Sequence, residues 1–274
     1  AGFTVIAYTV MFQALYFLQS GLHVSPGTAQ LLVGGSAFVG MGAFIFFGWL
    51  SDRVGRRKPI IIGYALVLLL LMPLYHFMGS VANPALYQAA ERAPVVVSGP
   101  DCSFDPFAKV QPSPCGKLLD HFSKRGIPYD KRAGDRPAVT IGGTTVTDLS
   151  TDGLDAALTA RGYDFGVVKP DWPRAMLLFL ALLLLWTLSG ATYGPVAALL
   201  SEYFPARIRY SSLSIPYHIG TGYFGGFLPL VSQYIVARTG DPYAGLWYTI
   251  VVVAGALLTC LIALPETRGA KLGA

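Results

Sequence analysis

Six long apolar runs that contain no Asp, Glu, Lys or Arg constrain this chain more than any other feature. A helix needs about 20 residues to cross a hydrocarbon core of about 30 Å, and each run has about that length. Lipid also excludes unpaired charge from spanning helices, so the runs are typical of an all-α membrane protein. The six predicted transmembrane helices cover residues 2–20, 28–50, 59–78, 176–200, 211–236 and 244–264.

Composition supports the bilayer as solvent. Charged residues make up 13% of the chain, against about 25% in an average soluble domain. The net charge of +5 raises the question of a nucleic-acid partner, but residues 81–174 carry eleven basic and eleven acidic side chains. The basic excess therefore lies in short loops between apolar runs, and we expect no nucleic-acid binding.

The short loops predict the orientation. Loop 51–58 carries four basic residues, whereas the alternating loops 21–27 and 238–243 carry one between them. The positive-inside rule places the basic loops in the cytoplasm of a cell with the protein in its cytoplasmic (inner) membrane. Six spans then leave both termini in the cytoplasm and residues 81–173 outside.

Residues 81–173 are too long for an ordinary loop. The Pro-rich first half predicts irregular structure. In the second half, residues 138–141 and 144–146 flank two glycines and predict a hairpin, and Ser150 or Thr151 is positioned to cap a helix that ends near Gly162. We predict a small α+β extracytoplasmic domain at 81–173, inserted between spans at 1–80 and 174–274.

Two of the three cysteines, Cys102 and Cys115, fall in this polar segment. A disulfide between them fits an oxidising compartment and would contribute roughly 3 kcal/mol, although two free thiols remain an alternative. Cys260 lies in an apolar run, where we expect a small packing residue.

The loop between the second and third runs reads Gly-Trp-Leu-Ser-Asp-Arg-Val-Gly-Arg-Arg-Lys over residues 48–58. Its glycines permit close helix approach and a tight turn, and its arginines could serve only to set topology. The whole string resembles the signature loop of the major facilitator superfamily. The resemblance implies a gate that holds two halves of a transporter together, formed by Gly48, Asp52, Arg53, Gly55, Arg56 and Arg57.

Two further strings, 201–210 and 265–269, resemble loops of metabolite:proton symporters and sugar porters in the same superfamily. The charges allow an ion pair between Glu202 and Arg207 or Arg209, and another between Glu266 and Arg268. Exposed pairs contribute only about 0–1 kcal/mol, so we expect their role to be conformational. Plain interfacial charge is the alternative.

By this resemblance the six spans correspond to family helices seven to twelve, the C-terminal half of the fold. We therefore expect that an N-terminal half is missing or that a partner chain supplies it. The long insertion departs from the family pattern. The first residue is Ala, and no basic segment precedes the first run, so no signal peptide is predicted.

Uncharged polar and aromatic residues in the spans are candidates for substrate binding. His218 could titrate near neutral pH or hydrogen-bond a substrate. The alternative is a neutral His bonded to a backbone carbonyl or to a hydroxyl on a neighbouring helix. It stands where many relatives carry an uncharged amide. The candidate substrate-binding residues are Tyr8, Gln13, Tyr193, Tyr217 and His218.

The function predicted from the resemblance is secondary active transport of a small organic acid, zwitterion or other metabolite, coupled to protons. The spans contain no carboxylate, so facilitated diffusion by a sugar-type porter is an alternative. A membrane-anchored sensor that works through the inserted domain is another. No catalytic motif, phosphate loop or metal-spaced Cys/His cluster occurs, and we expect no enzyme, cofactor or metal.

Overall fold

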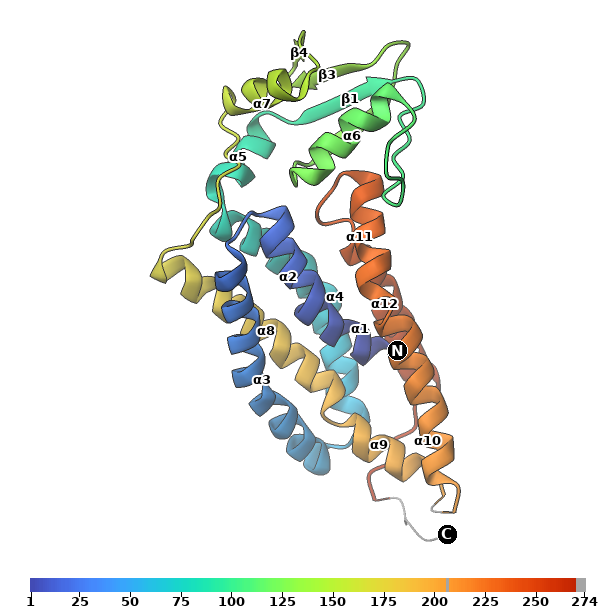
Figure 1. Cartoon of the computed structure of the whole chain (residues 1–274). Helices are drawn as coiled ribbons and strands as arrows, with labels where there is room; N and C mark the ends of the chain where they lie inside the picture. The colour runs from blue at the N-terminus through green and yellow to red at the C-terminus, as the bar shows by residue number, and fades with distance from the viewer. Residues whose placement is uncertain (206, 270–274) are drawn as a thin grey trace.

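The computed structural model describes residues 1–205 and 207–269 as a helical bundle that carries a small sheet domain at one end (Figure 1). The bundle consists of α1 (Gly2–Tyr8), η1 (Thr9–Gln13), α2 (Ala14–Tyr16), η2 (Phe17–Gly21), α3 (Pro26–Val54), α4 (Arg57–Ala82), α8 (Trp172–Tyr193), α9 (Val196–Tyr203), α10 (Arg209–His218), η3 (Ile219–Gly225), α11 (Leu228–Thr239) and α12 (Leu246–Ala263), where η denotes a π-helical segment. The sheet domain consists of α5 (Pro84–Arg92), β1 (Val95–Gly99), α6 (Pro114–Lys124), β2 (Tyr129–Ala133), β3 (Ala138–Ile141), β4 (Thr144–Val146) and α7 (Thr151–Thr159).

Five helices in the described residues are long and apolar enough to span a membrane. They are Gly2–Gly21, Pro26–Val54, Arg57–Ala82, Trp172–Tyr203 and Leu246–Ala263. The predicted span at 211–236 is helical but divided into α10, η3 and α11, and it is not among the five. Pro216 and a run of four glycines between 220 and 226 explain the division, because they interrupt helical hydrogen bonding and lower the hydropathy.

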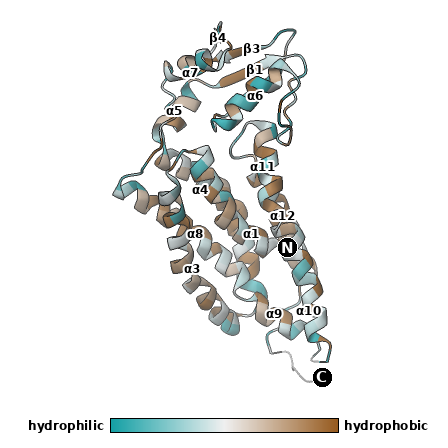
Figure 2. Ribbon diagram, viewed as in Figure 1, coloured by the Kyte–Doolittle hydropathy of each residue, from teal (hydrophilic) through white to brown (hydrophobic). Residues whose placement is uncertain are grey.

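Hydrophobic residues, coloured brown, recur along the helices of the bundle (Figure 2), and many of them are exposed. On α3, Leu31 and Phe38 are each 77% exposed and Ile45 is 75% exposed. A water-soluble fold does not leave a row of large apolar side chains uncovered, whereas hydrocarbon solvates them. The bundle is therefore that of a multi-pass membrane protein.

Inside the bundle, α8 packs against both α3 and α4. The close approach depends on particular glycines. A Cβ atom on Gly40 would lie 2.6 Å from Cβ of Trp186, and one on Gly190 would lie 2.9 Å from the backbone of Ala43. By contrast, a Cβ atom on Gly34 or Gly42 would meet nothing within 4 Å.

The sheet domain has its own hydrophobic core, separate from that of the bundle. Its strand order is β2-β1-β3-β4, with β1 parallel to β2 and antiparallel to β3. The β3–β4 hairpin is present as predicted, and Ser150 caps α7 by accepting a hydrogen bond from Gly153 N–H at 3.1 Å. The predicted irregularity of the first half is wrong: it supplies the central strand β1 and helix α6. The run of three β-branched residues at 95–97 was the available sequence signal, and the structure buries Val95 and Val97 in β1.

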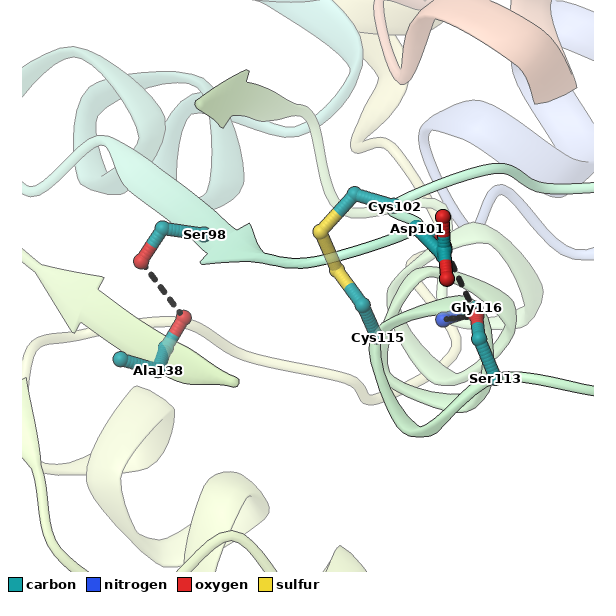
Figure 3. The surroundings of a disulfide bond; sticks show 7 residues. All are labelled: Ser98, Asp101, Cys102, Ser113, Cys115, Gly116 and Ala138. Atoms are coloured by element: carbon teal, nitrogen blue, oxygen red, sulfur yellow. Dashed lines mark hydrogen bonds between the residues drawn. A yellow bond between two sulfur atoms is a disulfide. The ribbon is translucent and has the colours of Figure 1, made fainter. Parts of the chain in front are cut away.

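Cys102 and Cys115 form a disulfide with Cα atoms 4.9 Å apart (Figure 3). Cys115 is fully buried in the first turn of α6. That turn is fixed by Ser113, whose hydroxyl accepts from Gly116 N–H at 2.9 Å and donates to the carbonyl of Asp101 at 2.8 Å. The disulfide therefore ties the end of β1 to α6 across the domain core.

Removing this disulfide is expected to destabilise the sheet domain by about 3 kcal/mol, because the bridge closes a loop of 13 residues in the unfolded chain. The change is the double replacement Cys102→Ala and Cys115→Ala in the full chain. Hydrogen exchange of the β1 amides should accelerate about 100-fold in the variant. Dithiothreitol should reproduce the effect in the wild type and leave the variant unchanged. Equal protection in both proteins would contradict a stabilising role.

Candidate functional site

The loop between α3 and α4 is built around a glycine that no other residue can replace. Gly55 has φ +100°, a conformation that strains other residues. A Cβ atom there would clash with the Glu266 carboxylate. The loop therefore turns sharply and lets the chain that follows α12 approach the start of α4.

Arg56, the next residue, lies at the centre of a group that we call the Arg56 cluster: Ser51, Asp52, Arg56, Glu202, Glu266 and Thr267. The Arg56 guanidinium donates from Nη2 to Glu202 Oε1 at 2.8 Å, and from Nη1 to Ser51 Oγ at 2.7 Å and to the Asp52 carboxylate. Thr267 Oγ1 donates to the other Glu202 oxygen at 2.7 Å. The arginine side chain is 9% exposed and Glu202 is 14% exposed, so this ion pair is largely shielded from water.

Glu266 closes the cluster through the backbone. Its Oε1 accepts from Arg56 N–H at 2.8 Å, and its Oε2 accepts from Arg57 N–H at 3.2 Å. The free N–H groups of the first turn of α4 thus bind a carboxylate, the arrangement that a helix N-terminus favours. Burial alone would raise the pKa of Glu266, but backbone hydrogen bonds from Arg56, Arg268, Arg57 and Thr267 lower it below its ordinary 4.5.

This shift predicts how the cluster depends on pH. Because the folded-state pKa is depressed, the stabilisation by Glu266 is complete above about pH 4.5 and is lost as pH falls through the lower folded value. Thermal unfolding of the detergent-solubilised chain should show a melting temperature that drops below about pH 4.5. Glu266→Gln should melt lower at pH 7 and show a smaller drop. An unchanged pH profile in the variant would refute the role of this carboxylate.

The two predicted ion pairs have other partners. Glu202 pairs with Arg56, while Arg209 donates from Nε to the carbonyl of Phe204 at 3.2 Å and Arg207 is exposed. Arg268 approaches Glu266 through its backbone N–H at 3.1 Å and not through its guanidinium. The predicted ion pairs were wrong because they joined charges within one sequence string. The fold instead brings residues 51–56 against Glu202 and residues 266–267.

The remaining motif residues surround this cluster. The guanidinium of Arg53 lies 4.0 Å above the Trp49 ring, and Arg57 Nη2 donates to the carbonyl of Leu261 at 2.6 Å. Gly48 faces the carbonyl of Gly194 at ordinary contact distance. Arg57 therefore joins the start of α4 to the end of α12, and Arg53 projects outward along α3.

A second group of candidates lies on one polar, aromatic face of the bundle. Tyr193 and Tyr217 share a hydrogen bond between their hydroxyls at 2.7 Å. Phe3 packs edge-on against Tyr193, with ring centroids 4.8 Å apart, and Tyr8 packs against Phe12 at 5.3 Å. Side chains from α1, α8 and α10 thus meet on this face. Substrate binding by these residues stays a prediction.

Two candidates lie differently. Gln13 is only 2% exposed, and its Oε1 accepts from Gln233 Nε2 at 3.1 Å, nearer the sheet domain than the tyrosines. The sequence interpretation missed Gln233, whose signal was an amide within an apolar run. His218 is exposed, and its Nδ1 donates to the carbonyl of Ser214 at 2.8 Å, the backbone bond considered as its alternative role.

These features define a class: a multi-pass membrane protein with a shielded arginine–carboxylate cluster at one end of its bundle and a polar face along it. Residues 1–90 match the family model described as Major Facilitator Superfamily.

Curated relatives agree with this match. The citrate-proton symporter of Klebsiella pneumoniae is 32% identical over 91 residues, 33% of this chain and 20% of that protein. The inner membrane metabolite transport protein YhjE of Escherichia coli K12 is 33% identical over 93 residues, 34% of this chain and 21% of that protein. A putative proline/betaine transporter of Staphylococcus aureus COL is 40% identical over 70 residues, 25% of this chain and 15% of that protein.

The matched part of the chain thus spans about a fifth of the length of the first two relatives. No solved structure matches the chain. The relatives and the family model confirm the predicted resemblance to major facilitator transporters of the metabolite:proton symporter type.

Proposed function

We propose that the chain forms one half of a secondary active transporter that carries a small metabolite across the cytoplasmic membrane together with protons, by alternating access. The other half is an N-terminal segment or a partner chain. The face that bears Tyr8, Tyr193 and Tyr217 turns toward that half and contributes to the central substrate site. Both termini and the Arg56 cluster lie in the cytoplasm, and residues 81–173 lie outside.

One observation carries this proposal: three strings far apart in sequence converge on Arg56. Loop 48–58, Glu202 and Glu266–Thr267 share hydrogen bonds at the end of the bundle opposite the sheet domain. A cluster that holds the ends of α3, α4, α9 and α12 together can act as a gate. The Arg56 cluster would form in one conformation of the transporter and break in the other. Alternating access requires contacts of this kind, which differ between the two conformations.

Transport is tested with membranes that contain the complete native protein, reconstituted into vesicles. Citrate and proline are offered with an acidic exterior and an alkaline interior. We expect one of them to accumulate above its external concentration, and a protonophore to abolish the accumulation. Accumulation that persists without a pH gradient would refute proton coupling and favour the facilitative alternative. No exchange of either solute would contradict transport of these classes.

A sensor that acts through the sheet domain is the second candidate. The domain's own core and its disulfide favour this function. Asp52→Asn separates the two, because Asp52 is part of the Arg56 cluster and remote from the domain. Loss of uptake with normal membrane insertion supports transport. Unchanged uptake after Asp52→Asn, with loss of a cellular response on deleting 81–172, supports the sensor.

A further inference from the structure

The sheet domain is hydrogen-bonded to the end of the bundle on which it lies (Figure 1). Backbone N–H of Tyr129 donates to the carbonyl of Gly240 at 3.2 Å, and the Tyr129 hydroxyl donates to the carbonyl of Ala237 at 3.1 Å. On the other side, His23 Nε2 donates to the carbonyl of Arg125 at 2.9 Å. The domain thus bridges the segment after η2 and the turn between α11 and α12.

Two glycines permit this close contact between the sheet domain and the bundle, which we call the seam. Gly126 has φ +63°, and a Cβ atom there would clash with the carbonyl of Ser20. Gly240 has φ +81°, and a Cβ atom there would lie 2.5 Å from the Tyr129 ring. Because side chains cannot fit at either position, bundle and domain meet backbone to backbone.

A cavity of about 100 Å³ lies at this seam. The bundle and the domain both contribute to its wall, the polar members being Gln13, Tyr16, Ser20, Ser123, Tyr129 and Gln233. On this scale one water takes roughly 10–15 Å³, so the cavity has room for a small solute. Its walls are held by the hydrogen bonds of the seam, which reduces the ordering cost of binding.

The chemistry of the wall is polar but uncharged. No Asp, Glu, Lys, Arg or His of the described residues lines the cavity. The Gln13–Gln233 hydrogen bond uses one amide oxygen and one amide nitrogen, and the Gln13 nitrogen and the Gln233 oxygen have no other partner in the described part of the chain. One donor and one acceptor are therefore available, together with the Ser123 hydroxyl.

We infer that this seam cavity is a binding site for a small polar solute of zero net charge, such as a zwitterion or a polyol. An anion like citrate would lose its hydration there without meeting a cation, which is unfavourable. This inference rests on the proposed function, because the bound solute is the transported substrate. The substrate binds in the seam cavity before it reaches the face that bears Tyr8, Tyr193 and Tyr217. Part of the wall belongs to the inserted domain, so the site depends on the insertion.

The test is equilibrium binding of radiolabelled proline, glycine betaine, sorbitol and citrate to the purified full-length protein in lipid nanodiscs. We expect at least one neutral probe to bind saturably, and we expect no citrate binding at the seam cavity. Gln13→Leu and Gln233→Leu should each weaken the neutral probe about tenfold, and the double variant should be no worse than either alone. Ser123→Phe fills the cavity from the domain side and should abolish binding at this site.

Gln88→Leu is the matched control: the same chemical change on the exposed face of α5, outside the cavity, should leave binding unchanged. Absence of saturable binding by all three neutral probes overturns the inference. So does unchanged binding in both Gln233→Leu and Ser123→Phe, or citrate competition that depends on Gln13. Seam binding without vesicle uptake would instead contradict the proposed transport and leave the binding site standing.

Discussion

Replacing Arg56 by methionine is expected to lower solute uptake about 100-fold while the protein still inserts into the membrane. Methionine retains the apolar stem but leaves Glu202 and Asp52 without their common cation. Breaking a shielded ion pair by removing one partner costs about 3 kcal/mol, the low end for pairs that retain some water. Uptake is measured in cells whose only copy of the protein carries the change, with surface amount quantified by immunoblot.

Two companion variants identify the cause of that loss. Arg53→Met removes a neighbouring arginine whose guanidinium lies over the Trp49 ring and outside the Arg56 cluster, so uptake should stay within about twofold. Arg56→Met combined with Glu202→Gln removes the stranded carboxylate and should recover part of the melting temperature that the single change loses. Full uptake by Arg56→Met at normal abundance would show that the Arg56 cluster is no gate.

The second large effect is expected from Gly40→Val in α3. A Cβ atom at this position would lie 2.6 Å from Cβ of Trp186, so α3 and α8 must separate to admit valine. Overpacking of this kind costs about 1–3 kcal/mol, and here the contact is one of the main helix pairs of the bundle. The melting temperature of the detergent-solubilised chain should fall by several degrees, and the yield of folded protein should fall with it.

Gly34→Val is the matched control on the same helix, because a Cβ atom there meets nothing within 4 Å. Both changes replace glycine by the same β-branched residue, so helix propensity cancels in the comparison. A melting temperature close to that of the wild type is expected for Gly34→Val. Equal melting temperatures for the two variants would contradict the packing of Gly40 against Trp186.

The candidate site was predictable in its members and not in its pairings. Glu202, Glu266 and Arg56 stood out because each lies in a charged string beside an apolar run. The Arg56–Glu202 ion pair spans 146 residues of chain, and the hydrogen bond from Arg56 N–H to Glu266 spans 210. Both depend on where the helix ends meet, which a single sequence does not encode directly. Gln13 was likewise identified as a polar residue in a span, while its partner Gln233 came to light only through the packing of η1 against α11.

The sequence by itself determined that this is a membrane protein, because repeated charge-free runs of about 20 residues have the length and apolar character of transmembrane helices. It also determined the β3–β4 hairpin and the cap of α7, since turn glycines and a capping serine act within a few residues. Tertiary structure alone decided that three distant strings meet at Arg56, that β1 lies between β2 and β3, and that the sheet domain and the bundle together line a cavity. These arrangements depend on contacts between segments far apart in the chain, where the free energy comes from complementary packing and not from local preference.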